Sequence, residues 1–207
     1  MPNPNRTEII SVFGQSGTGK SSWIEKRLPS IPRYILWDTL GEYEGDVIVE
    51  TKQELIKLLF KKESSYFGIV FRSMAMDQAQ IEDLDFMCRS AGAIGNVWVI
   101  IDEVDQYASP TTGMPEQLQM ILKRGRHLGV SMIFASRRPA EVHRLITAQS
   151  RRFILFRTGE GRDIAFLKSH VGAAADELVS LPDLHFIDWN HGKIEKGEIL
   201  WGIEKKA

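Results

Sequence analysis

The sequence predicts an α/β fold in which helices cover a mainly parallel sheet on both faces. Seven strand-like runs recur along the chain, at 8–13, 33–38, 46–50, 66–71, 97–102, 130–135 and 152–157. Several of them, including VWVIID, are apolar throughout, as expected for strands that are buried on both sides. Helical patterns separate the strands, and this alternation is typical of parallel sheets whose strands are joined by crossover helices.

The helical segments follow from capping residues and apolar spacing. Thr51 caps a helix whose leucines share one face, and two later segments end in glycine, as helices often do. The predicted helices cover 20–28, 51–62, 77–92, 115–129 and 161–172. The C-terminal stretch 185–202 instead predicts a β-hairpin that turns at Asn190-His191-Gly192.

Length and composition predict one globular domain over residues 1–207. Hydrophobic residues make up 43% of the chain, and the single cysteine, Cys88, excludes an intrachain disulfide and is expected to be buried on a helix. The five histidines have no metal-ligand spacing with cysteine, so no zinc site is expected. No apolar run approaches the roughly 18 residues that span a membrane, and the polar N-terminus does not resemble a signal peptide. We therefore expect a soluble, cytoplasmic protein with no transmembrane segment.

The stretch VFGQSGTGKSS, residues 12–22, places three glycines between a predicted strand and a predicted helix. It fits the phosphate-binding loop GxxxxGK[ST], whose glycines let successive backbone N–H groups point at one centre, where the helix N-terminus adds positive potential. Lys20 would reach the β- and γ-phosphates of ATP, and the Ser21 hydroxyl would ligate Mg²⁺. The predicted ATP-binding residues are Gly14, Gln15, Ser16, Gly17, Thr18, Gly19, Lys20, Ser21 and Ser22.

The run VWVIIDEVD resembles a Walker B strand that ends in a metal-binding acid followed by a catalytic glutamate. Asp102 would hold Mg²⁺, directly or through water, and Glu103 would orient and polarise the attacking water. Nucleotide kinases usually lack the second acid, so the pair favours ATP hydrolysis over phosphoryl transfer. A small-molecule kinase and a nucleotide-dependent assembly switch remain the alternatives from other classes.

Two further stretches, WDTLGEY and KRGRHLGVSMIFASRRP, complete a pattern that resembles the HerA/FtsK superfamily of DNA-pumping ATPases. Members often carry D-x-x-G-E-Y after the second strand, and G-R-x-x-G before a sensor strand that ends in T-Q-R-P. The resemblance covers roughly 8–157, the motor core, and leaves the C-terminal helices and hairpin at 158–207. It implies a RecA-like P-loop NTPase of the ASCE type. It also implies an arginine finger that acts in the neighbouring subunit of a homo-oligomeric ring, a hexamer or a pentamer.

This sequence departs from the family pattern at the sensor. Arg137 stands where the family has glutamine, and a guanidinium cannot accept a hydrogen bond. Arg137 could instead offer positive charge to the γ-phosphate, or it could face DNA. Arg126 is the best match to the arginine finger, and Arg124 is the near alternative. For both residues, the alternative to a catalytic role is a surface arginine at a helix C-terminus.

Charge is distributed unevenly although the net charge is only −1. Residues 123–157 contain nine Lys or Arg and a single acid, a balance of +8, so the remainder of the chain carries −9. This segment is a candidate surface for double-stranded DNA, with Arg144, Arg151 and Arg152 as the candidate contacts. The alternative is a set of solvated helix ends.

The short chain favours one kind of pump within the superfamily. Most cellular members carry membrane anchors or additional DNA-binding modules. Small stand-alone motors resemble the genome-packaging ATPases of internal-membrane icosahedral viruses, which push DNA into a preformed capsid. Such a motor would dock on a capsid vertex or a viral membrane protein and would work in the host cytoplasm or on the virion. A cellular or plasmid DNA-transfer ATPase is the rival within the same superfamily.

Overall fold

A computed structural model gives the structure of the chain and describes residues 7–61 and 66–200. The described residues form one nine-stranded sheet in the order β3-β4-β2-β5-β6-β1-β7-β8-β9. The strands are β1 (Ile9–Phe13), β2 (Arg33–Trp37), β3 (Val47–Val49), β4 (Phe67–Phe71), β5 (Trp98–Ile101), β6 (Ser131–Ser136), β7 (Arg152–Leu155), β8 (His185–Asn190) and β9 (Lys193–Glu198). Strands β1 to β7 pair in parallel and the last two pair antiparallel, which confirms the predicted fold class.

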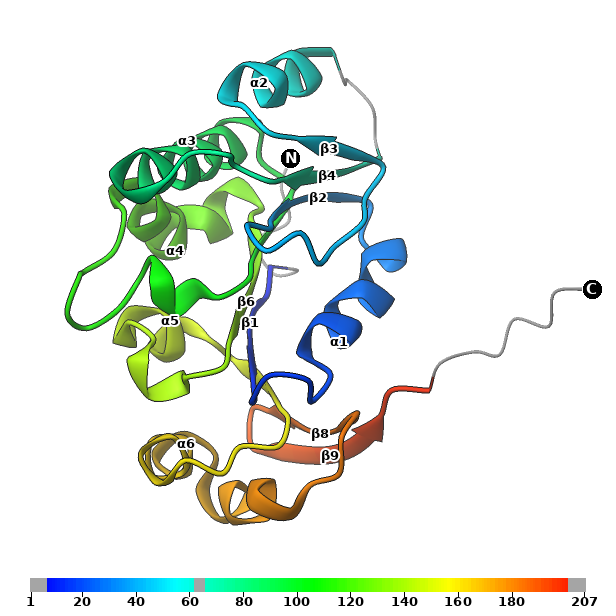
Figure 1. Cartoon of the computed structure of the whole chain (residues 1–207), viewed down its shortest axis with the longest axis vertical. Coiled ribbons are helices and arrows are strands. Elements are labelled where there is room, and N and C mark those ends of the chain that lie inside the picture. Colours follow the sequence, from blue (N-terminus) through cyan, green and yellow to red (C-terminus); the bar gives the residue numbers. More distant parts are fainter. Residues whose placement is uncertain (1–6, 62–65, 201–207) are drawn as a thin grey trace, which may run out of the picture.

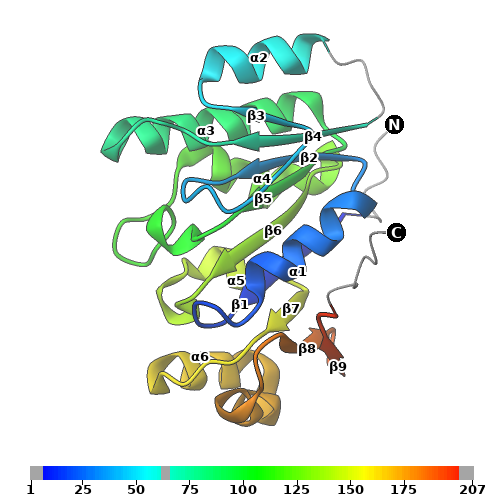
Figure 2. The same ribbon diagram turned by 45° about the vertical axis from the view of Figure 1, so that its right-hand side comes forward.

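Helices cover both faces of this sheet (Figures 1 and 2). They are α1 (Lys20–Arg27), α2 (Lys52–Lys61), α3 (Asp77–Ile94), α4 (Glu116–Leu128), α5 (Arg144–Gln149) and α6 (Gly161–Val171). Figure 1 shows α1 on one face and α3, α4 and α5 on the opposite face, with α6 and the hairpin β8–β9 at one end. Because the strands that carry the predicted motifs pair in parallel, their carboxyl ends share one edge of the sheet.

The core is divided into two layers by the sheet. Beneath α1, Trp23 and Ile24 pack with the strand residues Val12 and Ile133. The other layer holds residues of α3, α4 and α6, including the fully buried Cys88, as predicted for that cysteine. Trp23 is only 6% exposed, so its ring packs in this core rather than lying open to a nucleotide base.

Most predicted elements differ from the observed ones by one or two residues at each end. Exceptions are α5, whose six residues are too few for a periodic pattern, and the 3-10 helix Gly172–Ser180, which the sequence also does not predict. The hairpin turns at His191-Gly192, and residues 201 and 202, the last of the predicted hairpin stretch, lie outside the described residues. The two edge strands differ: β3 has three residues, whereas β9 has six, mostly exposed. In the part of the chain that the structure describes, no helix is long and apolar enough to cross a membrane.

Candidate active site

The glycine-rich loop leaves β1 at Phe13 and enters α1 at Lys20, at the carboxyl edge of the sheet. Gly17 and Gly19 have φ angles of 76° and 118°, which side chains other than glycine rarely adopt. Gly14 is required for a different reason, because a Cβ there would lie 2.5 Å from the Cβ of Phe156. The sequence places glycine where the backbone must turn or pass closely against its neighbours.

Backbone contacts hold the ends of this loop. The amide of Gly14 donates to the carbonyl of Ser136 at 3.3 Å, and the amide of Gln15 donates to the carbonyl of Arg157 at 2.9 Å. Farther along, the amide of Leu184 donates to the carbonyl of Thr18 at 2.9 Å. The loop is therefore fixed to β6, to the end of β7 and to the segment that enters the hairpin.

Lys20 is buried within this loop and lies among acidic groups. Its ammonium donates to the carbonyl of Gln15 at 3.1 Å, and its side chain is directed back over the loop. Burial lowers the pKa of Lys20, while the negative charges of Asp102, Glu103 and Glu42 act in the opposite direction. Asp102 and Glu103, at the end of β5, thus lie near enough to the P-loop lysine for their charges to act on its pKa.

Asp102 follows β5, and each of its carboxylate oxygens accepts one hydrogen bond. The hydroxyl of Tyr43 donates to Oδ2 at 2.6 Å, and the amide of Glu103 donates to Oδ1 at 2.8 Å. Burial raises the pKa of Asp102, whereas these two hydrogen bonds lower it. Burial, together with the charge of Asp102 and the hydrogen bond to it, raises the pKa of the Tyr43 hydroxyl, so this group remains a donor.

Glu103 has an unusual backbone conformation for a residue with a side chain. Its φ and ψ are 48° and 45°, in the left-handed region, where strain often accompanies function. Its carboxylate accepts a hydrogen bond from Nε of Arg137 at 3.2 Å. Burial and the charge of Asp102 raise the pKa of Glu103, and the guanidinium of Arg137 lowers it. From the sequence, Arg137 is expected to contact the γ-phosphate or DNA. In the structure its partner is instead Glu103, the candidate catalytic glutamate.

The loop after β2 supplies residues whose role no sequence pattern identifies, although the stretch WDTLGEY marks the segment. Asp38 is 1% exposed and accepts hydrogen bonds from the amides of Gly41, Glu42 and Tyr43 at 2.8–3.1 Å. Nη2 of Arg72 donates to the same carboxylate at 3.0 Å. This side-chain capping fixes the loop and presents Tyr43 to Asp102.

Ser21 and Asp102 are the groups that could share a magnesium ion with bound phosphates. A hydroxyl and a carboxylate are oxygen donors of the kind that Mg²⁺ prefers, and it usually binds few protein ligands together with phosphates and water. Among the described residues, no group of three or more His, Cys, Asp or Glu side chains could hold a metal ion alone. The donor set therefore fits a magnesium ion that arrives with the nucleotide.

The remaining predicted residues lie in other parts of the fold. Arg126 is in the last turn of α4, exposed, at the amino end of β6 and so at the opposite end of the sheet from the P-loop. It lines a groove of about 340 Å³ together with Lys123 and Arg151. Arg124 is exposed on the same helix, and Arg144 is exposed at the first position of α5.

Arg152 differs from the other candidate DNA contacts. Its guanidinium is paired with Asp188 of β8 through several hydrogen bonds, the one from Nε at 2.9 Å. A carboxylate that is held in this way neutralises the arginine and fixes its direction. The pair joins β7 to the hairpin, and a DNA contact by Arg152 stays a prediction.

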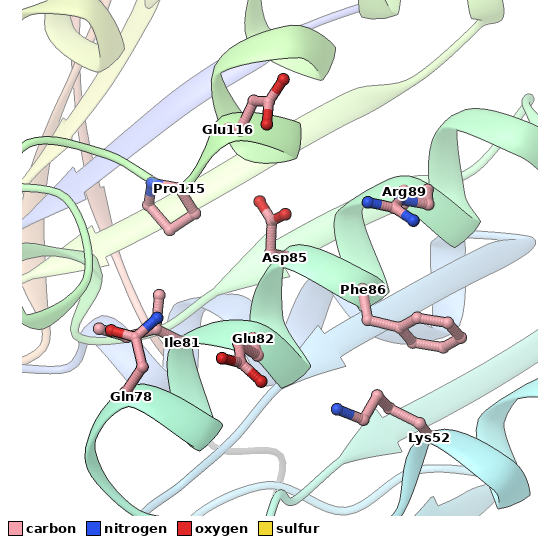
Figure 3. A pocket seen from close by; sticks show the side chains of 9 residues that line it. All are labelled: Lys52, Gln78, Ile81, Glu82, Asp85, Phe86, Arg89, Pro115 and Glu116. Atoms are coloured by element: carbon pink, nitrogen blue, oxygen red, sulfur yellow. The ribbon is translucent and has the colours of Figure 1, made fainter.

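Two hollows lie near the carboxyl edge of the sheet. One, of about 340 Å³, borders the P-loop at Gln15 and Ser16 and is lined by Arg137 and Arg138. The other, of about 370 Å³, lies between α2, α3 and α4 and has charges of both signs (Figure 3). Lys52, on its wall, pairs with Asp83 at 2.8 Å. None of the residues that line this second hollow belongs to the predicted nucleotide site.

The strand order, the glycine-rich loop after β1 and the acids after β5 define the RecA-like fold of P-loop ATPases. Solved structures of this fold include the genome packaging NTPase B204 from Sulfolobus turreted icosahedral virus 2 in complex with ATP-gammaS. It is 19% identical over 96% of this chain and 100% of that chain, with a TM-score of 0.77. VirB4 of Thermoanaerobacter pseudethanolicus is 14% identical over 98% of this chain and 92% of that chain, with a TM-score of 0.72.

A third similar structure is the pCW3 conjugation coupling protein TcpA, 14% identical over 93% of this chain and 60% of that chain, with a TM-score of 0.58. No protein-family model matches the sequence, and no curated protein matches it. The chain thus resembles viral packaging ATPases in fold.

Proposed function

We propose that this chain is an ATPase that hydrolyses ATP with Mg²⁺ and uses the energy to move double-stranded DNA. The observation that carries the proposal is the position of Glu103. Its strained backbone places a carboxylate at the end of β5, close enough to the P-loop to act on Lys20 electrostatically. A phosphate-binding loop beside a metal-binding acid and a separate base is the arrangement that phosphate-ester hydrolysis needs.

Each residue of the site has a distinct task in this proposal. The loop amides and Lys20 would bind the phosphates, and Ser21 and Asp102 would hold Mg²⁺, which would offset the charge of the β- and γ-phosphates. Glu103 would accept a proton from the attacking water through its second oxygen, because Oε2 is engaged by Arg137. The guanidinium favours the ionised form of Glu103, so Arg137 would keep the base charged and oriented.

Hydrolysis is tested with two variants at the P-loop and at the base. Lys20→Ala should lose nucleotide binding. Glu103→Gln should bind ATP with Mg²⁺ but hydrolyse it on the order of 10²-fold more slowly, the usual contribution of a positioned base. Phosphate release without any acceptor would exclude the kinase, and continuous turnover would exclude the switch. Parental turnover in Glu103→Gln would remove Glu103 from the mechanism.

Genome packaging is the form of DNA movement that we propose. Its support is the similarity in fold to the viral NTPase, with a TM-score of 0.77, against 0.72 for VirB4 and 0.58 for the coupling protein. DNA transfer between cells is the second candidate, because VirB4 and a conjugation coupling protein share the fold. The ATPase rate with and without double-stranded DNA tests whether the chain acts on DNA, which packaging and transfer both require. Uptake of labelled DNA by purified empty capsids, with Glu103→Gln as the control, separates packaging from transfer.

A homo-oligomeric ring, a hexamer or a pentamer, is the assembly that we propose. Arg126 lies at the end of the sheet opposite to its own P-loop, so it can act on a nucleotide only in a second copy. A guanidinium remains charged and can bridge two phosphate oxygens, which suits a finger that acts in trans. The mass of the assembly with bound nucleotide, measured for the parent chain, tests the ring directly.

A further inference from the structure

Glu42 is the glutamate of the stretch WDTLGEY, and the pattern that contains it gives it no role in the nucleotide site. It lies in the loop after β2, where the carboxylate of Asp38 accepts a hydrogen bond from its amide at 3.1 Å. Asp38 also accepts from the amides on either side, so the backbone of Glu42 is held by three neighbouring contacts. The direction in which its side chain leaves the loop is therefore built into the fold.

The side chain of Glu42 meets the P-loop at the predicted magnesium ligand. The hydroxyl of Ser21 donates to Oε2 of Glu42 at 2.8 Å. Asp102 accepts from other donors, Tyr43 and the amide of Glu103, and each of them uses one lone pair of a carboxylate oxygen and leaves another free. Ser21 thus gives its hydrogen bond to Glu42, while Asp102 keeps lone pairs for the metal.

We propose that Glu42 is a positioning residue for Mg²⁺, which acts by orienting the hydroxyl of Ser21. A hydroxyl that donates its proton to a carboxylate has its lone pairs directed away from that carboxylate and becomes a better oxygen ligand. Groups that hold a metal ligand in this way commonly change metal affinity by about 10–100-fold. This inference rests on the proposed function, since it needs magnesium and a nucleotide at the P-loop.

The charges around Glu42 favour a cation at this position. Burial is the main cause that raises the pKa of Glu25, and the negative charges of Glu42 and Glu44 raise it further. The three carboxylates therefore lie near one another. On the other side, the charge of Glu42 acts on Lys20 and on Asp102. Of the charged groups named here, only Lys20 is positive. A divalent ion would therefore offset the remaining negative charge of the carboxylates.

The test measures nucleotide affinity rather than turnover. Titration calorimetry with a non-hydrolysable ATP analogue, in Mg²⁺ and in EDTA, gives the factor by which magnesium strengthens binding. We expect Glu42→Ala to reduce this factor by about 10–100-fold and to leave the affinity in EDTA unchanged. Glu42→Gln should fall between Glu42→Ala and the parent, because an amide oxygen accepts the proton but carries no charge.

Two further variants make the result specific. Glu44→Ala is the matched control, because Glu44 is an exposed acid two residues away that adds charge but does not accept the hydrogen bond from Ser21, so its removal should lower the magnesium factor far less than Glu42→Ala does. In the Ser21→Ala background, removal of Glu42 should have no further effect, since its target is gone. An equal loss in Mg²⁺ and in EDTA would indicate that Glu42 supports only the loop, and it would overturn the proposal. So would an unchanged magnesium factor.

The parent chain separates this inference from the proposed function. If the parent binds the analogue equally well with and without Mg²⁺, both the ATPase proposal and the role of Glu42 fail. If the parent shows the magnesium effect and Glu42→Ala retains it, the ATPase proposal stands and only the role of Glu42 fails. Because Glu42 is exposed, its removal should leave the fold intact, and an unchanged melting temperature checks this.

Discussion

Replacing Tyr43 with phenylalanine removes a single hydroxyl group and leaves the shape of a fully buried side chain almost unchanged. That hydroxyl donates to the carboxylate of Asp102 at 2.6 Å, and Tyr43 is 1% exposed, so water cannot readily replace it. A hydrogen bond to a charged group contributes about 1.5–3 kcal/mol to stability. For a domain of this size the melting temperature changes by about 2–4 °C per kcal/mol, so we expect a fall of about 3–12 °C.

The stability lost in Tyr43→Phe should depend on pH, because the hydrogen bond from Tyr43 favours the ionised form of Asp102 and so lowers the pKa of Asp102. Without the hydrogen bond the pKa of Asp102 is higher in the variant, so the cost of Tyr43→Phe should be fully present above the variant's pKa and should shrink as the pH falls from there toward the lower pKa of the parent. Thermal unfolding of both proteins without nucleotide, across pH 4–8, measures this difference.

Tyr107→Phe is the matched control. The hydroxyl of Tyr107 is also buried, but both of its partners are neutral: it donates to the amide oxygen of Gln80 at 3.0 Å and lies 3.2 Å from the hydroxyl of Thr39. Its removal should cost about 0.5–1.5 kcal/mol with no comparable dependence on pH. Equal losses in the two variants, or a loss in Tyr43→Phe that does not change with pH, would refute the reasoning about Asp102.

Three further predictions concern assembly, DNA and the base. Arg126→Ala should bind nucleotide yet turn over about 10³-fold more slowly, and mixing it with Lys20→Ala should restore some activity; no recovery in mixed rings confirmed by mass would count against a finger in trans. Neutralising Arg144 and Arg151 together should reduce the salt dependence of duplex binding, and an affinity that does not change with salt would exclude this surface. Because the pKa of Glu103 is raised, the hydrolysis rate should decline as the pH falls toward it, beginning above the ordinary value of 4.5; a rate that stays flat to that value would oppose the assignment.

The sequence predicts the strands of the central sheet well because each is an unbroken apolar run between turn signals. β5 illustrates this, since every residue from Trp98 to Ile101 is apolar and three of them are buried. The P-loop is predictable for the same local reason: its glycines lie where the chain must turn or pass close to Phe156. Local patterns therefore locate the elements and the loop that binds phosphate.

Contacts between distant segments are what the sequence does not reveal. Arg152 is one of several arginines in a basic segment, and its partner Asp188 is 36 residues away, on a strand that pairs antiparallel. Likewise, nothing local indicates that Asp38 caps the amides of its own loop, or that Tyr43 reaches Asp102. These partners are fixed by strand register and loop conformation, which depend on the whole fold.

The outermost strand β9 limits how copies of the chain can join. An open strand edge is a template for another strand, and natural sheets often guard it with charged side chains. Four of the six residues of β9 are charged and exposed: Lys193, Glu195, Lys196 and Glu198. A strand that paired here would have to set its own side chains beside these charges, which disfavours an uncharged partner. Copies of this protein, even when crowded together, should therefore resist edge-to-edge aggregation, and specific contacts between them should use helices and loops instead.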